Sequence, residues 1–294
     1  MAAYYQPSNK FSPLSLIYFV VACITAIPIL ALIYSYAIWY IPFPYINFFI
    51  TLGFGFGIGW VVQKLAISLG KVRNNKLAYF LGFLGALIGL YLSWAIWVDL
   101  VINAGETYGS SRIGISVSNI KLLQVLDLAL QPSLLFELMG QIMDVGVWGI
   151  RSTTVSGWFL GLIWIIEALI VVVMGTIIPA GKSGEPFCEL NQKWYTEKQL
   201  PALSYLTAEM QAVTPLENND FSALKEISYV SDPTTANHSV FTLYSNETNE
   251  NYLSIQNRTA TVNDKGETKF TDHEVVTHLR INEEFSDFLA TIPS

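Results

Sequence analysis

Charged residues are scarce in this chain for its length. Of the 294 residues 13% are charged and 52% are hydrophobic. A soluble globular domain typically carries about twice that charged fraction. The combination excludes a disordered chain and a nucleic-acid-binding protein.

Cysteine and histidine are scarce too. The two cysteines are Cys23, inside an apolar run, and Cys188, just after one, so neither a disulfide framework nor a cysteine metal site can be built. His273 and His278 are five residues apart on an expected strand and should point to opposite faces. No phosphate-binding glycine loop, nucleophile elbow or convincing carboxylate pair is present. We therefore expect no metal site, no cofactor and no catalytic residues.

The charge that is present divides the chain near residue 180. Residues 1–180 hold 8 Lys and Arg against 6 Asp and Glu, whereas residues 181–294 hold 8 against 17. The first part is therefore nearly neutral and the second strongly acidic. This division predicts two domains of different physical character.

Four apolar runs in the first part are long enough to cross a bilayer as helices. A span needs roughly 20 mostly apolar residues, because its backbone must satisfy its own hydrogen bonds in lipid. The runs cover residues 14–40, 45–62, 77–98 and 157–178. Pro28 predicts a kink in the first run, which is too long for a cleaved signal peptide. The sequence predicts an α-helical integral membrane protein with four transmembrane helices and a small C-terminal cytoplasmic α+β domain.

Lysine and arginine counts give the expected orientation. The segment from Lys64 to Lys76 contains four basic residues, and the connection over residues 41–44 contains none. The connection before the fourth span has only Arg112, Lys121 and Arg151 over roughly 55 residues. Because basic loops face the cytoplasm, we expect both termini to be cytoplasmic. A bacterial inner (plasma) membrane accords best with this pattern.

Small residues recur at a four-residue spacing in the second and third spans. This spacing places missing side chains on one helix face and lets helix backbones approach closely in lipid. We expect these glycines to pack the two spans as a tight hairpin; a pore lining is the alternative. They are Gly53, Gly55, Gly57 and Gly59 in the second span and Gly82, Gly85 and Gly89 in the third.

Glu167 is the intramembrane polar candidate, because it lies near the centre of the fourth span. An ionised carboxylate at that depth is costly, and spans one to three offer no Lys or Arg there. The simplest expectation is a protonated side chain that joins helices by hydrogen bonds, to a neighbouring helix or to a second copy. The available polar groups are those of Cys23, Thr25, Ser35, Tyr91 and Ser93. The alternative is a proton or cation relay, or a contact for a basic residue of another subunit.

The connection over residues 104–156 should be an external loop with an amphipathic helix. From Pro132 to Val145 the apolar residues share one helical face and Glu137, Gln141 and Asp144 the other. This helix is too short and too polar to cross the bilayer, so we expect it to lie on the outer surface or to cap the bundle. A shorter helix is expected over residues 119–130.

The sequence of the acidic part predicts a small α+β domain with a three-stranded antiparallel meander. Alternating strands are expected over residues 239–245, 252–262 and 268–281, with a hairpin turn at Asn263–Gly266. Helical spacing is expected over residues 220–229 and 283–292.

These features favour a non-enzymatic membrane protein. The bundle would anchor or assemble a complex in the lipid bilayer, and the acidic tail would dock a protein partner; the alternative partner is a second copy of the chain. The alternative is a small proton- or ion-coupled transporter or channel subunit that uses Glu167. A membrane enzyme ranks third, because no cluster of catalytic groups is visible.

Overall fold

The computed structural model describes residues 4–41, 43–109, 114–146, 148–150, 153–207 and 213–292. Arg112 and Arg151, which entered the comparison of loop charges, lie outside the described residues. The chain forms two compact units, Ser8–Gly184 and a second one made of Met1–Pro7 with Glu185–Ser294. We describe each unit by itself.

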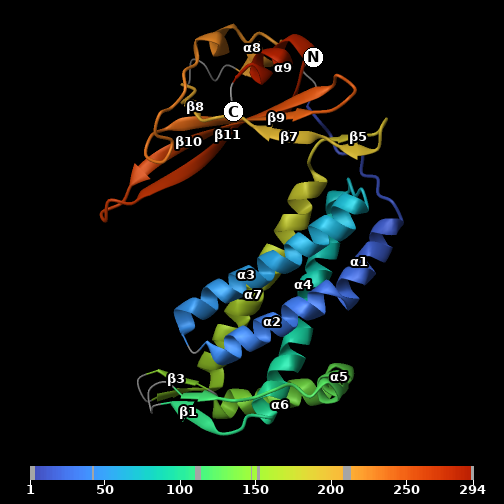
Figure 1. Ribbon diagram of the computed structural model, residues 1–294, viewed down its shortest axis with the longest axis vertical. Coiled ribbons are helices and arrows are strands. Elements are labelled where there is room, and N and C mark those ends of the chain that lie inside the picture. The colour runs from blue at the N-terminus through green and yellow to red at the C-terminus, as the bar shows by residue number, and fades with distance from the viewer. Residues whose placement is uncertain are drawn as a thin grey trace. The chain divides into compact units, whose positions relative to one another are not determined.

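The first unit contains four helical segments long and apolar enough to cross a membrane (Figure 1). They are Leu14–Tyr40, Tyr45–Leu69, Asn75–Ile102 and Gly157–Ser183. Large apolar side chains cover their outer surfaces; Ile24 and Phe49, for example, are each 69% exposed. Exposed apolar surface on this scale is unusual for a soluble protein and is typical of helices in lipid.

The first segment is broken where the sequence predicts a kink. Helix α1 (Leu14–Ile24) ends at Thr25, and α2 (Ala26–Tyr40) begins directly after it. The break lies one turn before Pro28, whose ring clashes with the carbonyl four residues earlier. The Thr25 hydroxyl donates to the Val21 carbonyl, which secures the end of α1.

The second segment is longer than expected. Helix α3 (Pro44–Val62) continues as a π-helix, η1 (Gln63–Leu69), so Lys64 belongs to a helix rather than to a loop. Ala66 and Ile67 of η1 are fully buried, and this packing outweighs the polar residues around them. The connection to the third segment is therefore only residues 70–74.

The N-terminal residues of this unit are fixed to that short connection. Arg73 N–H donates to the Lys10 carbonyl at 2.9 Å, and Ser12 N–H to the Gly70 carbonyl at 3.3 Å. The Arg73 side chain is buried and donates to the Ser8 hydroxyl. This arginine therefore has a structural role in addition to its charge.

Helices α4 (Asn75–Ile102) and α7 (Gly157–Ser183) form the third and fourth segments and extend beyond the predicted bounds. Between them lie two short hairpins that the sequence analysis did not predict, β1 and β2 (Thr107–Gly109, Gly114–Ser116) and β3 and β4 (Trp148–Ile150, Thr153–Val155).

The two expected helices of this connection are present as α5 (Leu122–Leu130) and α6 (Pro132–Val145). They meet at Gln131 with a bend of 105°, and as a pair they are long and apolar enough to form a broken span or a re-entrant loop. Figure 1 shows them at the end of the bundle where α4 ends and α7 begins. The sequence predicts that α6 alone is too polar to cross the bilayer. Helix α5 adds further apolar residues, of which Leu122, Leu123 and Leu130 are exposed.

The second unit contains a five-stranded sheet, two strands more than the predicted meander. The predicted strands are β9 (His238–Ser245), β10 (Asn251–Val262) and β11 (Thr268–Ile281), paired antiparallel. The additional strands β7 (Thr196–Gln199) and β8 (Leu203–Ser204) both pair with β9. A separate hairpin is formed by β5 (Phe187–Cys188) and β6 (Lys193–Trp194).

One face of this sheet forms the core of the unit. Phe241 and Leu253 of the sheet pack with Phe285 and Leu289 of α9 (Glu283–Ala290). Two further helical elements complete the unit, α8 (Val213–Glu217) and a 3₁₀ turn, η2 (Ser222–Glu226), where a longer helix over 220–229 was expected. Figure 1 shows α8 and α9 on the same side of the sheet.

Candidate functional site

Glu167 lies in α7, one helical turn before Val171, which packs against Gly55 of α3. The Tyr34 hydroxyl of α2 is within electrostatic reach of its carboxyl group. That hydroxyl lies 3.3 Å from the Thr51 Oγ1 of α3, and the Tyr34 ring stacks on Phe54 at 4.3 Å between centroids. Three helices therefore contribute to one small polar cluster, which we call the Glu167 cluster (Tyr34, Thr51 and Glu167).

Four of the five polar groups expected beside Glu167, all but the Cys23 thiol, donate hydrogen bonds elsewhere. Ser35 donates to the carbonyls of Ala31 and Ser93, and Tyr91 donates to the Ala129 carbonyl. Tyr34 and Thr51 were not anticipated from the sequence. The glycine spacing does contain a signal for Thr51. Gly55 of α3 lies against Val171 of α7. Thr51 precedes Gly55 by four residues, and Glu167 precedes Val171 by four residues.

The Glu167 cluster has unused hydrogen-bonding capacity. Within the described part of the chain, the Glu167 carboxyl group has no hydrogen-bond partner. The Asn47 Oδ1 is buried without a partner and lies one helical turn from Thr51 on α3. A protonated Glu167 carboxyl group is a hydrogen-bond donor, and the Tyr34 and Thr51 hydroxyls can each donate or accept.

The seven glycines do not share one role. Gly55 and Gly59 of α3 and Gly82 of α4 face α7: a Cβ at Gly59 would lie 2.9 Å from the Met174 oxygen, and one at Gly82 would lie 2.6 Å from the Gly175 oxygen. The two spans therefore approach α7 closely as well as each other.

The remaining glycines differ among themselves. Gly85 and Gly89 face Val62 and Ile58 of α3, as a hairpin of the two spans requires. A Cβ at Gly57 would meet only the flexible end of Leu30 at 3.4 Å, and one at Gly53 would have no neighbour within 4 Å in the described chain. Close packing of the helices therefore does not require a glycine at position 53 or 57, although both fit the four-residue spacing.

Asp99 is a buried carboxylate that the sequence analysis missed. It lies near the end of α4 and is 0% exposed. Its Oδ2 accepts from Lys121 N–H at 2.9 Å, directly before α5, and its Oδ1 accepts from Asn103 Nδ2 at 3.1 Å. Asn103 also donates to Gln124 of α5. Asp99 therefore caps α5 from another helix, which is a structural role.

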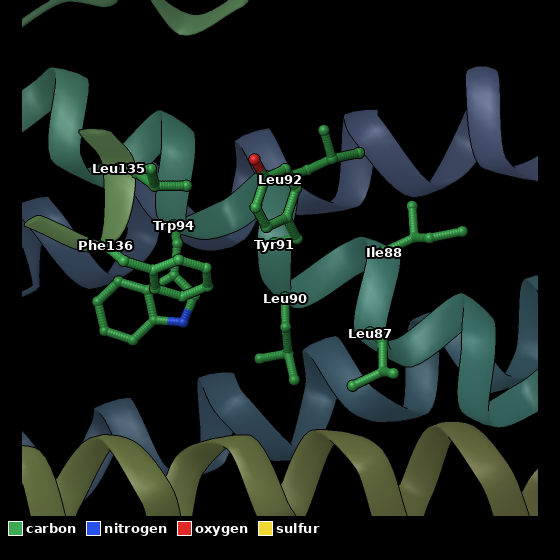
Figure 2. A pocket seen from close by; sticks show the side chains of 8 residues that line it. All are labelled: Leu87, Ile88, Leu90, Tyr91, Leu92, Trp94, Leu135 and Phe136. Atoms are coloured by element: carbon green, nitrogen blue, oxygen red, sulfur yellow. The ribbon is translucent and has the colours of Figure 1, made fainter. Parts of the chain in front are cut away.

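A crevice of about 460 Å³ separates α4 from α6 (Figure 2). Its walls include Leu87, Leu90 and Trp94 of α4 and Phe136 of α6. Tyr91 also lines it, but its hydroxyl donates to the Ala129 carbonyl. The crevice can accommodate hydrocarbon and has no arrangement of groups for a polar substrate.

The second unit has a strongly acidic end. Three segments meet there: Asn282 N–H donates to Asn219 Oδ1 at 2.7 Å, and Asn249 Nδ2 donates to Glu283 at 3.4 Å. Arg280 and Lys193 pair with two of the acids, Glu250 and Glu247. We call this surface the acidic end; its acidic residues are Glu217, Asp220, Glu247, Glu250, Glu283, Glu284 and Asp287.

An aromatic cluster lies on the sheet face opposite the core. Tyr252 packs edge-on against Tyr195 at 5.3 Å and Tyr5 at 5.5 Å, and His278 packs against Tyr244 at 4.9 Å. His278 lies in a β-bulge with a φ of 53°, and its N–H donates to the Ser254 hydroxyl. No group of three or more metal-ligating side chains occurs among the residues that the structure describes.

His278 makes the stability of this unit depend on pH. Burial lowers its pKa below the ordinary 6.5, although Glu274 opposes the shift. A lowered histidine pKa stabilises the fold fully above about pH 6.5, and this contribution is lost as the pH falls through the lower folded-state value. His278→Asn removes the titration and tolerates the positive φ. Thermal melts in detergent from pH 7.5 to 5 should show a smaller loss for this variant; identical profiles would contradict the assignment.

Comparisons with known proteins give no independent indication of function. No protein-family model, curated protein or solved structure matches this chain.

Proposed function

We propose that the chain is a non-enzymatic integral membrane protein that anchors or assembles a complex and docks a protein partner through its acidic domain. The observation that carries the proposal is the acidic end, where seven carboxylates from three segments outnumber the nearby basic side chains of Lys193, Lys225 and Arg280. The four candidate spans would supply the anchor, and their exposed apolar side chains favour a lipid environment.

The proposed orientation has both termini in the cytoplasm of a bacterial cell, with the spans in the inner membrane. Tyr5 pairs with His278 of the C-terminal unit, and Lys10 pairs with Arg73 of the connection between the second and third spans. These contacts support an orientation with both ends of the chain and this connection on one side, as an even number of spans requires. Lys71, Arg73 and Lys76 favour the cytoplasmic side.

This orientation also limits what α5 and α6 can do. A fifth complete span would place the two termini on opposite sides of the membrane. The pair would then enter and leave the bilayer on the outer side, consistent with its 105° bend and with the Asp99 cap at its start.

Docking at the acidic end would depend on charge. Complementary surfaces steer a basic partner and raise its association rate, and salt screens this effect. Glu284→Lys combined with Asp287→Lys should lower recovery of the co-purifying partner at least tenfold at low salt. Neither side chain has a partner in the described structure, so the fold should survive.

The matched control changes the net charge by the same amount at the other end of the sheet. Asp264→Lys with Glu267→Lys alters the turn between β10 and β11 and should leave recovery unchanged. Size exclusion with mass spectrometry of the solubilised complex gives the readout. A lone chain without a stoichiometric partner, or equal losses in both double variants, would contradict the proposal.

A second candidate function is a proton- or ion-coupled transporter or channel subunit that uses the Glu167 cluster. The Glu167 carboxyl group supports it, because it has no hydrogen-bond partner among the described residues and lies within electrostatic reach of Tyr34. Glu167→Gln preserves the shape and polarity of the neutral acid but cannot release a proton. If Glu167 only joins helices, this variant should assemble normally and be indistinguishable from wild type in vesicle flux. Normal assembly with loss of proton flux would instead establish the transport function.

A further inference from the structure

The segment before the first span forms a short β-bridge with an edge strand of the sheet in the C-terminal unit. Tyr4 pairs antiparallel with Leu279, and Tyr5 N–H donates to the His278 carbonyl at 2.9 Å. Strand β11 is the last strand of the sheet in the order β11-β10-β9-β7. The N-terminal residues therefore occupy part of an otherwise open sheet edge.

Two side-chain contacts accompany this pairing, one polar and one aromatic. The Tyr4 hydroxyl donates to Glu217 Oε1 at 2.8 Å, which places it at the acidic end. The Tyr5 ring lies on the other side, edge-on to Tyr252 and to His278 at 5.5 and 6.2 Å. Adjacent residues of an added strand point to opposite faces of the sheet. Two successive side chains therefore contact different parts of the edge.

Among the described residues, Tyr4 and Tyr5 provide the main-chain pairing of this segment, to residues 279 and 278. A short edge pairing of this kind is worth little as a bimolecular contact. Covalent attachment supplies a high effective concentration that compensates for weak intrinsic affinity. A partner segment with more contacts along β11 can therefore displace it.

We propose that the β11 edge is the docking site for an extended, basic segment of a partner protein, and that Tyr4 and Tyr5 occupy it until the partner binds. The inference rests on the proposed docking function and specifies its partner. Main-chain hydrogen bonds to residues 278–281 would provide affinity, and an aromatic residue would replace Tyr5 between Tyr252 and His278. Flanking lysine or arginine residues are favoured because Glu217 and Glu250 border this edge.

The test uses a labelled peptide with two adjacent tyrosines flanked by lysines, and a matched peptide with glutamates at the flanking positions. Fluorescence anisotropy measures their binding to the intact chain and to a variant lacking residues 1–7, both in detergent. The lysine-flanked peptide should bind the shortened chain at least tenfold more tightly than the intact chain. It should also bind at least tenfold more tightly than the glutamate-flanked peptide. Absence of binding to the shortened chain, or equal affinities in either comparison, overturns the proposal.

A second measurement does not depend on the folding of the shortened chain. Hydrogen exchange at the Tyr5 amide of the intact protein should be slow, and saturating lysine-flanked peptide should accelerate it. Unchanged exchange at saturation overturns the proposal. The shortened chain could instead bind the N-terminus of an intact copy in a mixed dimer. If the peptide does not dissociate this dimer, the proposal is overturned and the occupant of the edge is a second copy of the chain.

These results separate the inference from the proposed function. If the double variant at the acidic end loses the co-purified partner while removal of residues 1–7 leaves its recovery unchanged, docking stands and the edge is the wrong site. If no partner co-purifies but the peptide binds as expected, the edge is a strand-docking site and the assembly function is wrong.

Discussion

Replacing Gly59 by leucine is expected to abolish the folded helix bundle, whereas the same change at Gly53 in the same helix leaves it intact. A Cβ at position 59 would lie 2.9 Å from the Met174 backbone oxygen and 3.0 Å from the Ile178 Cβ. Backbone atoms cannot move aside as a flexible side chain can, so α3 and α7 must separate. Overpacking of a well-packed core typically costs about 1–3 kcal/mol, and the rigid backbone neighbours place this site at the upper end of that range.

Gly53→Leu is the matched control, because a Cβ there has no neighbour within 4 Å among the described atoms. The yield of monodisperse protein after detergent extraction and its thermal midpoint provide the readout. Gly57→Leu should fall between the two, since only the end of Leu30 must move. Equal yields of the Gly59 and Gly53 variants would contradict the packing of α3 on α7.

Asp99→Ala is expected to release the start of α5 from α4 and to lower stability markedly. The substitution leaves Lys121 N–H without its acceptor in a partly buried position, whereas Asn103 Nδ2 keeps the Asp99 carbonyl and Gln124 Oε1 as acceptors. A buried donor without a partner costs about 1–3 kcal/mol. Hydrogen exchange over residues 121–131 should accelerate at least tenfold.

Asp99→Asn provides the control for this prediction. The amide retains one oxygen that can accept from Lys121 N–H, so most of the protection of α5 should remain. Equal exchange in the alanine variant and wild type would show that α5 is held by its apolar contacts, Val125 and Leu128, rather than by the cap.

The sequence predicted well those elements whose apolar pattern extends over many residues. The strands β9, β10 and β11 begin and end within one residue of the expected bounds, because alternation over seven or more residues and the Asn263–Gly266 turn are strong signals. The short strands β7 and β8 carry no such alternation and depend on pairing with β9, more than 30 residues away. The extension of α3 into η1 was missed because Gln63 and Lys64 interrupt the apolar run.

The candidate site could be predicted only in part. Composition and depth identify Glu167, but its neighbours Tyr34 and Thr51 depend on which faces of three helices meet. Asp99 was missed because it falls one residue beyond the predicted third span. Tyr4 and Tyr5 have no local strand signal, and their pairing with residues more than 270 positions away arises only in the folded chain.

Membrane fractionation tests the central claim most directly. The full-length chain should remain in the membrane pellet after an alkaline carbonate wash and should be released only by detergent. This result is required if lipid surrounds the four apolar segments from Leu14 to Ser183. Recovery of folded, monodisperse chain in the aqueous fraction without detergent would contradict the account.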